Sequence, residues 1–246
     1  MATRIPPLRN PPIAFAHRGA RAVERDNTIP SFLLAARLGA TGMESDVWLT
    51  RDGVPILDHD GQLGRLRRRP ISSLDRADLP DHIPTLAEYY EHVGTSFDLS
   101  LDLKDPSHFE PVVAVTRNAS PEMVNRLWLC FGDHEIMQEW RRLEPDVRIV
   151  DSTRHKRISE GPERRAADLA NWGIDAINMR QDDWTGGLTT LFHRFDVLAF
   201  AWDVQFDRTL AATLDIGIDA VYSDHVDRMV DALTSFHPDT FVPGGI

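Results

Sequence analysis

The 246-residue sequence predicts an α/β fold, a single closed (β/α)8 barrel that occupies residues 1–246. Short runs of β-forming apolar residues alternate with longer segments of helical period, an order typical of parallel βαβ units. One such barrel takes roughly 250 residues, which is close to the length of this chain. An open doubly wound sheet is the alternative, but it normally carries a glycine-rich phosphate turn, and the sequence has no G-x-G-x-x-G motif.

The predicted strands are short, mostly apolar runs bounded by polar or turn residues. They cover residues 13–17, 42–49, 97–104, 124–131, 147–152, 176–179, 197–204 and 220–223. Helices are predicted where the pattern changes to a helical period, beginning near Thr28, Thr85, His108, Asp133, Pro162, Thr185, Phe206 and His225. The last helix shows one apolar face, formed by Val226, Met229, Val230 and Leu233.

One connection, residues 60–84, has no regular pattern. It carries a basic stretch in an acidic protein, with Arg65, Arg67, Arg68, Arg69 and Arg76. The simplest interpretation is a solvated loop, and the alternative is a basic rim that attracts anionic substrates to a nearby site. Because this segment is short, it leaves little room for a separate capping subdomain, and we expect an open site.

The composition excludes several classes of protein. Lys and Arg number 27 against 38 Asp and Glu, a net charge of −11 that argues against a nucleic-acid binder. Cys130 is the single cysteine, so neither an intrachain disulfide nor a cysteine metal cluster can form. The sequence shows no signal-peptide pattern and no apolar run of the roughly 18 residues that a membrane span needs. We expect a soluble cytoplasmic protein without stable membrane insertion, and its oligomeric state is not predicted.

Polar residues gather at or after the predicted strand ends. In a parallel barrel the reactive side chains lie at the carboxyl ends of the strands, so these residues are the candidates for chemistry. They are His17 and Arg18 after the first strand, Glu44 and Asp46 in the second, His59 after a short extended run, Asp102 and Lys104 in the third strand, and Trp202 in the seventh.

The spacing of the acidic residues suggests a metal site. Glu44 and Asp46 are two apart in a strand, so both face the barrel interior, which is costly without a compensating cation. With Asp102 they would form an all-oxygen site suited to Mg²⁺ or Ca²⁺. The alternative is that Arg18 and Lys104 neutralise Glu44 and Asp46 without a metal, and residue spacing supports both interpretations equally.

His17 and His59 are the candidate acid and base. Each follows an apolar β run and lies close in sequence to the acidic residues. An imidazole both accepts and donates a proton near neutral pH, which suits it to general acid–base catalysis.

Ordered motifs run through most of the chain. The first sixty residues contain AFAHRGA at 14–20, RDNTIPSF at 25–32 and GATGMESDVWLTRDGVPILDHD at 39–60. Further motifs are IPTLAEYY at 83–90, LDLK at 101–104, AFAWDV at 199–204 and GIDAVYSDH at 217–225. In order and spacing these motifs resemble those of the glycerophosphodiester phosphodiesterase family.

This resemblance implies a TIM barrel that cuts a glycerophosphodiester, a small-molecule substrate, to glycerol 3-phosphate and an alcohol. It implies that His17 and His59 are the acid–base pair and that one Mg²⁺ or Ca²⁺ is bound by Glu44, Asp46 and Asp102. It also implies that phosphate oxygens are held by Arg18 and Lys104, and that Trp202 packs against glycerol. The glycerol 2-hydroxyl is the implied nucleophile. Asn27 and Thr28 match the family's N-T pair and are expected to organise the loop and its helix cap.

The sequence departs from the family pattern at Asp26 and Asp102, where the family usually has Glu. Because Asp is one methylene shorter, a cation bound by Asp102 must shift or bind through a water. The Asp-x-Lys motif also resembles the sphingomyelinase D barrels, but those lack the G-V-P-I-L-D-H-D context and use disulfides. These departures affect the identity of the metal more than the class of reaction.

Two alternative functions remain. One is a phospholipase D-like enzyme on lysophospholipids, which would need an apolar groove, to which Trp48, Trp184 and Phe206 are the conceivable contributors. The other is a phosphate-binding barrel without catalysis, which the presence of both histidines and the lysine makes the weaker interpretation.

Overall fold

The computed structural model describes residues 4–64 and 68–245, so Arg65 and Arg67 of the basic stretch lie outside the described residues. Within these ranges a parallel sheet closes on itself, because β1 pairs with both β2 and β11. The barrel strands, in order, are β1 Ile13–His17, β2 Gly42–Leu49, β6 Asp98–Leu103, β7 Leu127–Phe131, β8 Arg148–Ser152, β9 Ala176–Arg180, β10 Leu198–Trp202 and β11 Ala220–Ser223. The predicted eight-stranded parallel barrel is confirmed.

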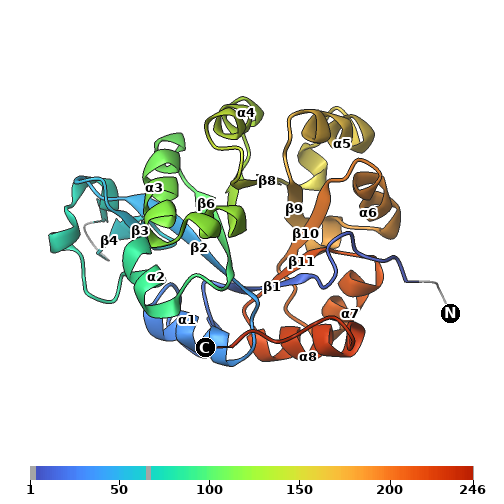
Figure 1. Ribbon diagram of the computed structural model, residues 1–246, viewed down its shortest axis with the longest axis horizontal. Coiled ribbons are helices and arrows are strands. Elements are labelled where there is room, and N and C mark those ends of the chain that lie inside the picture. The colour runs from blue at the N-terminus through green and yellow to red at the C-terminus, as the bar shows by residue number, and fades with distance from the viewer. Residues whose placement is uncertain (1–3, 65–67, 246) are drawn as a thin grey trace.

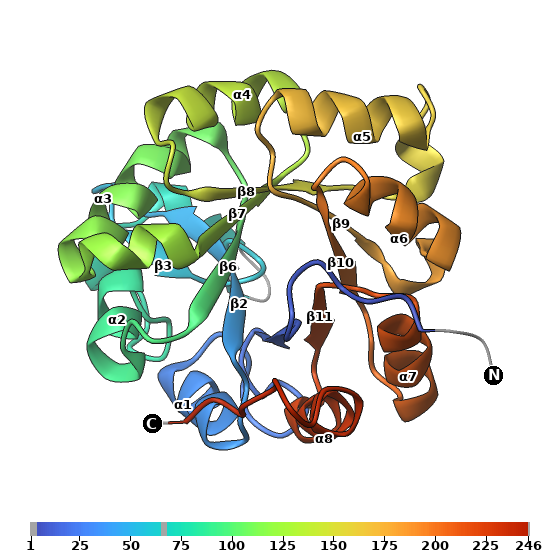
Figure 2. The ribbon, with the colours of Figure 1, turned by 45° about the vertical axis from the view of Figure 1, so that its right-hand side comes forward.

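Helices form a ring around these strands (Figures 1 and 2). They are α1 Ile29–Arg37, α2 Leu86–Val93, α3 Phe109–Ala119, α4 His134–Leu143, α5 Pro162–Asn171, α6 Gly186–His193, α7 Asp207–Asp215 and α8 Val226–Phe236. Each predicted helix begins at or immediately after its predicted starting residue. None of the helices in the described ranges combines the length and apolar character needed to cross a membrane.

Side-chain caps set several of these helix starts. Thr85 and Glu88 form a capping box, in which the Thr85 hydroxyl accepts from the Glu88 amide at 3.0 Å and the Glu88 carboxylate accepts from the Thr85 amide at 2.7 Å. The Thr28 hydroxyl accepts from the Ser31 amide at 3.4 Å. Each cap satisfies amide groups that a helix leaves unpaired at its start, so the strand-to-helix turns have fixed geometry.

Two predicted strands extend beyond the observed ones by more than one residue at one end. The run 124–131 begins in a 3₁₀ helix, Pro121–Arg126, and the strand starts only at Leu127. Val124 is buried in that helix, and periodicity alone does not separate a buried helical residue from a strand residue. The run 197–204 ends at Trp202, because Asp203 takes a φ of +63°, outside the β region.

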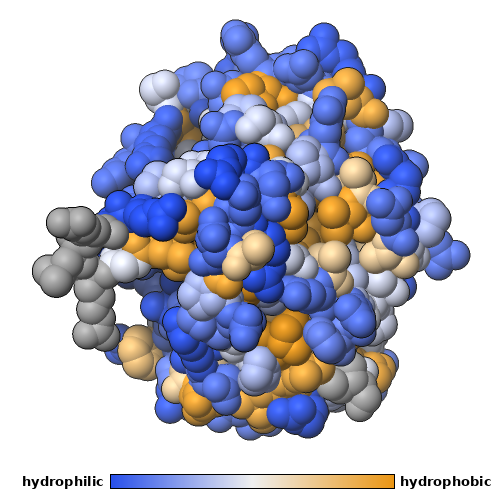
Figure 3. Space-filling model, turned by 90° about the vertical axis from the view of Figure 1, so that its left-hand side faces the viewer, coloured by the Kyte–Doolittle hydropathy of each residue, from blue (hydrophilic) through white to orange (hydrophobic). Residues whose placement is uncertain are grey.

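In its described residues, 60–64 and 68–84, the connection 60–84 is more ordered than a solvated loop. Just before it, β3 Pro55–Leu57 pairs antiparallel with β2, and within it β4 Gln62–Leu63 pairs with β5 Arg69–Pro70. Two 3₁₀ turns follow, Ile71–Ser73 and Arg76–Asp78. Together with Ile56 of β3, this segment buries a small apolar cluster formed by Ile71, Leu74, Leu79 and Ile83. The molecular surface on this side of the protein mixes hydrophilic residues with separate hydrophobic patches (Figure 3).

The barrel interior is packed below its carboxyl end. Phe15 stacks on Tyr222 with ring centroids 4.7 Å apart, and Phe200 packs against Trp128 at 5.1 Å. Arg9 pairs with Asp98 at the amino-terminal end of the barrel, with 2.9 Å between the charged atoms. The packed layer closes the barrel from below, so the polar strand ends above it are free to form a site.

Candidate active site

A cavity of about 550 Å³ opens at the carboxyl ends of the strands. It is lined by all eight predicted site residues: His17, Arg18, Glu44, Asp46, His59, Asp102, Lys104 and Trp202. At its floor the Ser100 hydroxyl lies 3.1 Å from the Tyr222 hydroxyl and 3.4 Å from the Cys130 sulfur. The volume suits a small-molecule ligand.

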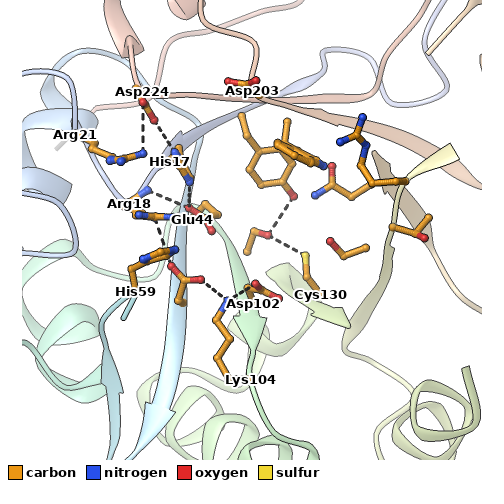
Figure 4. A pocket seen from close by; sticks show the side chains of 18 of the residues that line it. His17, Arg18, Arg21, Glu44, His59, Asp102, Lys104, Cys130, Asp203 and Asp224 are labelled. Carbon is orange, nitrogen blue, oxygen red and sulfur yellow. Dashed lines mark hydrogen bonds and ion pairs between the residues drawn. The ribbon is translucent and has the colours of Figure 1, made fainter. Parts of the chain in front are cut away.

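His17, the last residue of β1, is held between two carboxylates (Figure 4). Its Nδ1 lies 2.5 Å from Asp224 Oδ1, and its Nε2 lies 3.8 Å from Glu44 Oε2. Burial alone would lower the pKa of His17, but Glu44 and the hydrogen bond to Asp224 raise it above the usual value. The contact at Nδ1 orients the ring and leaves Nε2 facing the cavity.

Asp224 is a site residue that the sequence interpretation missed. It lies 3.5 Å from Arg21 as well as against His17. Burial alone would raise the pKa of Asp224, but the hydrogen bond from His17 and the nearby positive charges lower it. The residue directly follows β11, so the rule that functional side chains follow barrel strands could have found it.

Asp224→Asn is expected to lower kcat by about 10- to 100-fold, because the variant loses the anion that orients His17. Since Asp224 raises the pKa of His17, its loss should also move the acidic limb of the pH–rate profile to lower pH. A pH–rate series on wild type and variant measures both effects. The exposed Asp227→Asn on α8 is the control, and an unmoved acidic limb in Asp224→Asn would exclude this positioning role.

Glu44 and Asp46 both reach the cavity from β2, as their spacing predicts. Glu44 Oε2 accepts a hydrogen bond of 3.0 Å from the Arg18 amide. Burial raises the pKa of Glu44 to about 7, and the carboxylates of Asp46 and Asp102 add to the effect. The site therefore concentrates negative charge in a place with little water.

The turn after β1 has an unusual backbone that the N-T pair supports. Arg18 and Asn27 have φ of +55° and +53°, which is uncommon for residues other than glycine. The Asn27 side-chain oxygen accepts a hydrogen bond from the Ser45 hydroxyl at 2.7 Å. The Asn27 backbone N–H donates to the Arg18 carbonyl at 3.0 Å. These bonds, with the Thr28 cap, fix the direction in which the Arg18 side chain enters the site.

Basic side chains partly neutralise Asp46. The Lys104 amine lies 2.6 Å from Asp46 Oδ1 and also pairs with Asp102, while Arg18 Nε lies 3.4 Å from Asp46 Oδ2. Burial alone would lower the pKa of Lys104, but the two aspartates raise it. These are the ion pairs that the metal-free interpretation of the sequence gives Asp46, whereas Glu44 pairs with His17 and accepts a hydrogen bond from the Arg18 backbone amide.

The donor set also fits a hard cation at Glu44 and Asp46. Asp46 Oδ2 is buried and has no hydrogen-bond partner among the described residues. Carboxylate oxygens are the ligands that Mg²⁺ and Ca²⁺ prefer. Asp102 pairs with Lys104 instead, and the described residues contain no group of three His, Cys, Asp or Glu arranged to hold a metal.

His59 lies nearer the mouth of the cavity. Trp202, the last residue of β10, lines the wall across from it. The His59 side chain is 46% exposed, against 25% for His17, and its Nδ1 lies 2.8 Å from Asp60 Oδ1. The Arg154 guanidinium lies 5.7 Å from the centre of the Trp202 ring. Arg154 is a second residue that the sequence interpretation missed.

The sequence model of the glycerophosphoryl diester phosphodiesterase family matches residues 17–228, from the first site histidine into α8. The chain belongs to this family. The resemblance carried by the motifs is therefore confirmed, and the matched segment contains every predicted site residue.

Two known relatives show how far the likeness extends. Human glycerophosphodiester phosphodiesterase 1 is 31% identical over 155 residues, which cover 54% of this chain and 46% of the human protein. A Bacillus subtilis protein, YhdW, is 24% identical over 227 residues, covering 84% of this chain and 91% of that protein. The chain thus spans about half the length of the human relative and nearly all of the bacterial one.

Solved structures share the fold. The glycerophosphodiester phosphodiesterase of Thermotoga maritima superposes with a TM-score of 0.78 at 20% identity, covering 89% of this chain and 97% of that one. An Oleispira antarctica phosphodiesterase, solved with the product sn-glycerol-3-phosphate, has a TM-score of 0.74 at 22% identity, covering 90% and 96%. At these identities the comparison establishes the barrel fold.

Proposed function

We propose that this chain hydrolyses glycerophosphodiesters to glycerol 3-phosphate and an alcohol, using a divalent cation and a pair of histidines. The observation that carries the proposal is one cavity that brings His17 and His59 to the buried carboxylates of Glu44 and Asp46. Family membership supports the reaction class, and the glycerol 3-phosphate bound to the Oleispira phosphodiesterase supports the product. A cytoplasmic location remains our expectation.

The cation is proposed to be Mg²⁺ or Ca²⁺, held by Glu44 and Asp46, and Asp102 would become the third ligand by leaving its ion pair with Lys104. When bound, it would neutralise charge on the phosphate oxygens. Arg18 and Lys104 extend into the same cavity, and we assign them to the remaining phosphate oxygens. Without positive charge here, the buried carboxylates would repel an anionic diester.

The different exposure of the two histidines supports a division of their roles. His17 lies deeper, with Nδ1 against Asp224, so its Nε2 takes the proton from the glycerol 2-hydroxyl. The oxygen attacks phosphorus and releases the head-group alkoxide, and water then opens the resulting cyclic phosphate to glycerol 3-phosphate. His59 lies nearer the mouth, where the leaving alcohol departs, and protonates that alkoxide.

Asp102→Asn is expected to raise the metal concentration needed for half-maximal activity by about tenfold or more, because it removes one anionic ligand. Asp102→Glu should give no simple gain, since the pocket is built around the shorter side chain. Titrating activity with Mg²⁺ in wild type and both variants measures this. A titration curve in Asp102→Asn that matches wild type would remove Asp102 from the ligand set.

The experiment that tests the function compares glycerophosphocholine with lysophosphatidylcholine. Release of glycerol 3-phosphate is followed with a coupled dehydrogenase, and release of choline with a coupled oxidase. We expect rapid turnover of glycerophosphocholine and little of the lysophospholipid. The reverse preference would establish the phospholipase D-like alternative, and binding of glycerol 3-phosphate without turnover of either substrate would establish the non-catalytic barrel.

A further inference from the structure

The wall of the cavity formed by β8 and β9 carries polar side chains that the proposed reaction does not use. Ser152 and Asn178 are register partners on these adjacent strands, and both line the cavity. In the closed barrel β9 lies opposite β2, so Asn178 and Glu44 lie on opposite sides of the cavity. Figure 4 looks into this space, with Cys130 on the side away from His17.

The side-chain oxygen of Asn178 is buried without a hydrogen-bond partner among the described residues. The residue as a whole is only 6% exposed. A buried amide oxygen left unpaired is costly and uncommon in native proteins. The Asn178 side chain lines the cavity, and rotation about its last torsion exchanges the amide oxygen and nitrogen, so this amide can turn its oxygen to accept a hydrogen bond from a ligand there.

The surroundings of Asn178 indicate which ligand that is. A hydroxyl donates and accepts, and so it can bond an amide and the Ser152 hydroxyl together. The Trp202 ring lines the same side of the cavity and offers an apolar face to carbon atoms. The guanidinium of Arg154, which pairs with Asp183, lies 5.7 Å from the centre of that ring. An amide, a hydroxyl and one aromatic face fit a short polyol rather than an acyl chain.

We propose that Asn178, with Ser152, binds the terminal free hydroxyl of the substrate's glycerol, and that this contact selects fully deacylated diesters over lysophospholipids. The inference rests on the proposed function. An ester at that oxygen removes the hydrogen that the Asn178 oxygen accepts, and it places an acyl chain against polar side chains. A site built to bond a hydroxyl discriminates strongly against analogues that lack it.

The test uses a substrate pair that differs in this hydroxyl alone. Glycerophosphocholine is compared with 2-hydroxypropyl phosphocholine, which keeps the 2-hydroxyl but has a methyl group in place of the terminal CH₂OH. Wild type should favour glycerophosphocholine in kcat/KM by about 10- to 100-fold. Asn178→Leu, similar in size but apolar, should reduce this preference to about threefold or less. Ser152→Ala should reduce it by a smaller factor.

A matched control and a binding measurement complete the test. Asn171→Leu, an exposed position at the end of α5, should keep the wild-type preference. Calorimetry compares the affinities of glycerol 3-phosphate and 1,2-propanediol 1-phosphate in wild type and in each variant that melts cooperatively. If Asn178→Leu does not fold, Ser152→Ala provides the comparison in its place.

The outcomes separate this inference from the proposed function. Equal kcat/KM values for the two substrates in wild type, or an unchanged preference in Asn178→Leu or its stand-in Ser152→Ala, would overturn the hydroxyl subsite and leave the proposed reaction standing. No turnover of either substrate with added cation would contradict the proposed function. In that case calorimetry still tests the subsite. Tighter binding of glycerol 3-phosphate than of 1,2-propanediol 1-phosphate in wild type, lost in Asn178→Leu or its stand-in Ser152→Ala, would support it. Equal affinities for the two ligands in wild type would overturn it.

Discussion

Replacing His17 or His59 with Ala is expected to lower turnover of glycerophosphocholine by about 10²- to 10⁴-fold. Both side chains line the cavity at strand ends, outside the packed layer of the barrel, so the variants should stay folded. His17→Ala should have the larger effect, because it also leaves the Asp224 carboxylate without the imidazole that it contacts at 2.5 Å. The measurements are kcat at saturating substrate and a thermal melt of each variant.

His92 provides the matched control for the histidine variants. It lies exposed on α2, so His92→Ala should turn over substrate at the wild-type rate. The pH–rate profile of wild type should be bell-shaped if one histidine acts as base and the other as acid. Turnover near the wild-type rate in either His17→Ala or His59→Ala would exclude that residue from proton transfer.

Glu44→Gln is expected to abolish turnover and, without metal, to stabilise the protein at pH 8. In the folded chain burial raises the pKa of Glu44 to about 7, whereas an unfolded chain has a Glu pKa of about 4.3. The folded state therefore holds this proton more tightly than the unfolded state. The free energy of unfolding falls as pH rises from the unfolded value through the folded one, and the wild type is penalised above that range.

Gln carries no charge at any pH and avoids this penalty. At pH 8 and with a chelator present, Glu44→Gln should be more stable than wild type by on the order of 1–3 kcal/mol. The difference should shrink at pH 5, where Glu44 is mostly protonated in the folded chain. Added Mg²⁺ should also narrow it, because a bound cation favours the carboxylate.

Chemical denaturation at pH 5 and pH 8, with chelator and with Mg²⁺, measures these four differences. Glu91→Gln, an exposed change on α2, is the control and should leave stability nearly constant in all four conditions. A Glu44→Gln variant that is less stable than wild type at pH 8 without metal would show that the Glu44 charge is already compensated by the protein. A variant that keeps its activity would remove Glu44 from the metal site.

The fold was predictable because its strong patterns belong to long, buried elements. The helix that begins at Val226 has one apolar face, and Thr85 with Glu88 forms a cap that is readable as sequence. The two-residue strands within 60–84 were not predictable, because their pairing depends on where the chain returns in space. A basic stretch with few apolar residues gives no period that would reveal the cluster around Ile71 beneath it.

The site was predictable where chemistry and strand position coincide. His17, Glu44 and Asp102 each stand near a strand end in a recognisable motif, and the structure brings them to one cavity. Asp224 escaped notice because its contact with His17 joins residues 207 positions apart. Asn178 escaped notice because a lone Asn in a strand has no distinctive chemistry until its burial and its missing partner are known.

The most direct test of the proposed reaction is phosphorus NMR of the purified protein with glycerophosphocholine. With Mg²⁺ or Ca²⁺ present, the diester signal should decline as glycerol 3-phosphate accumulates, with choline released in equal amount. A chelator should stop this conversion, and restored cation should resume it. Accumulation of choline phosphate, or conversion that continues at the same rate in excess chelator, would contradict a cation-dependent cleavage that leaves the phosphate on glycerol.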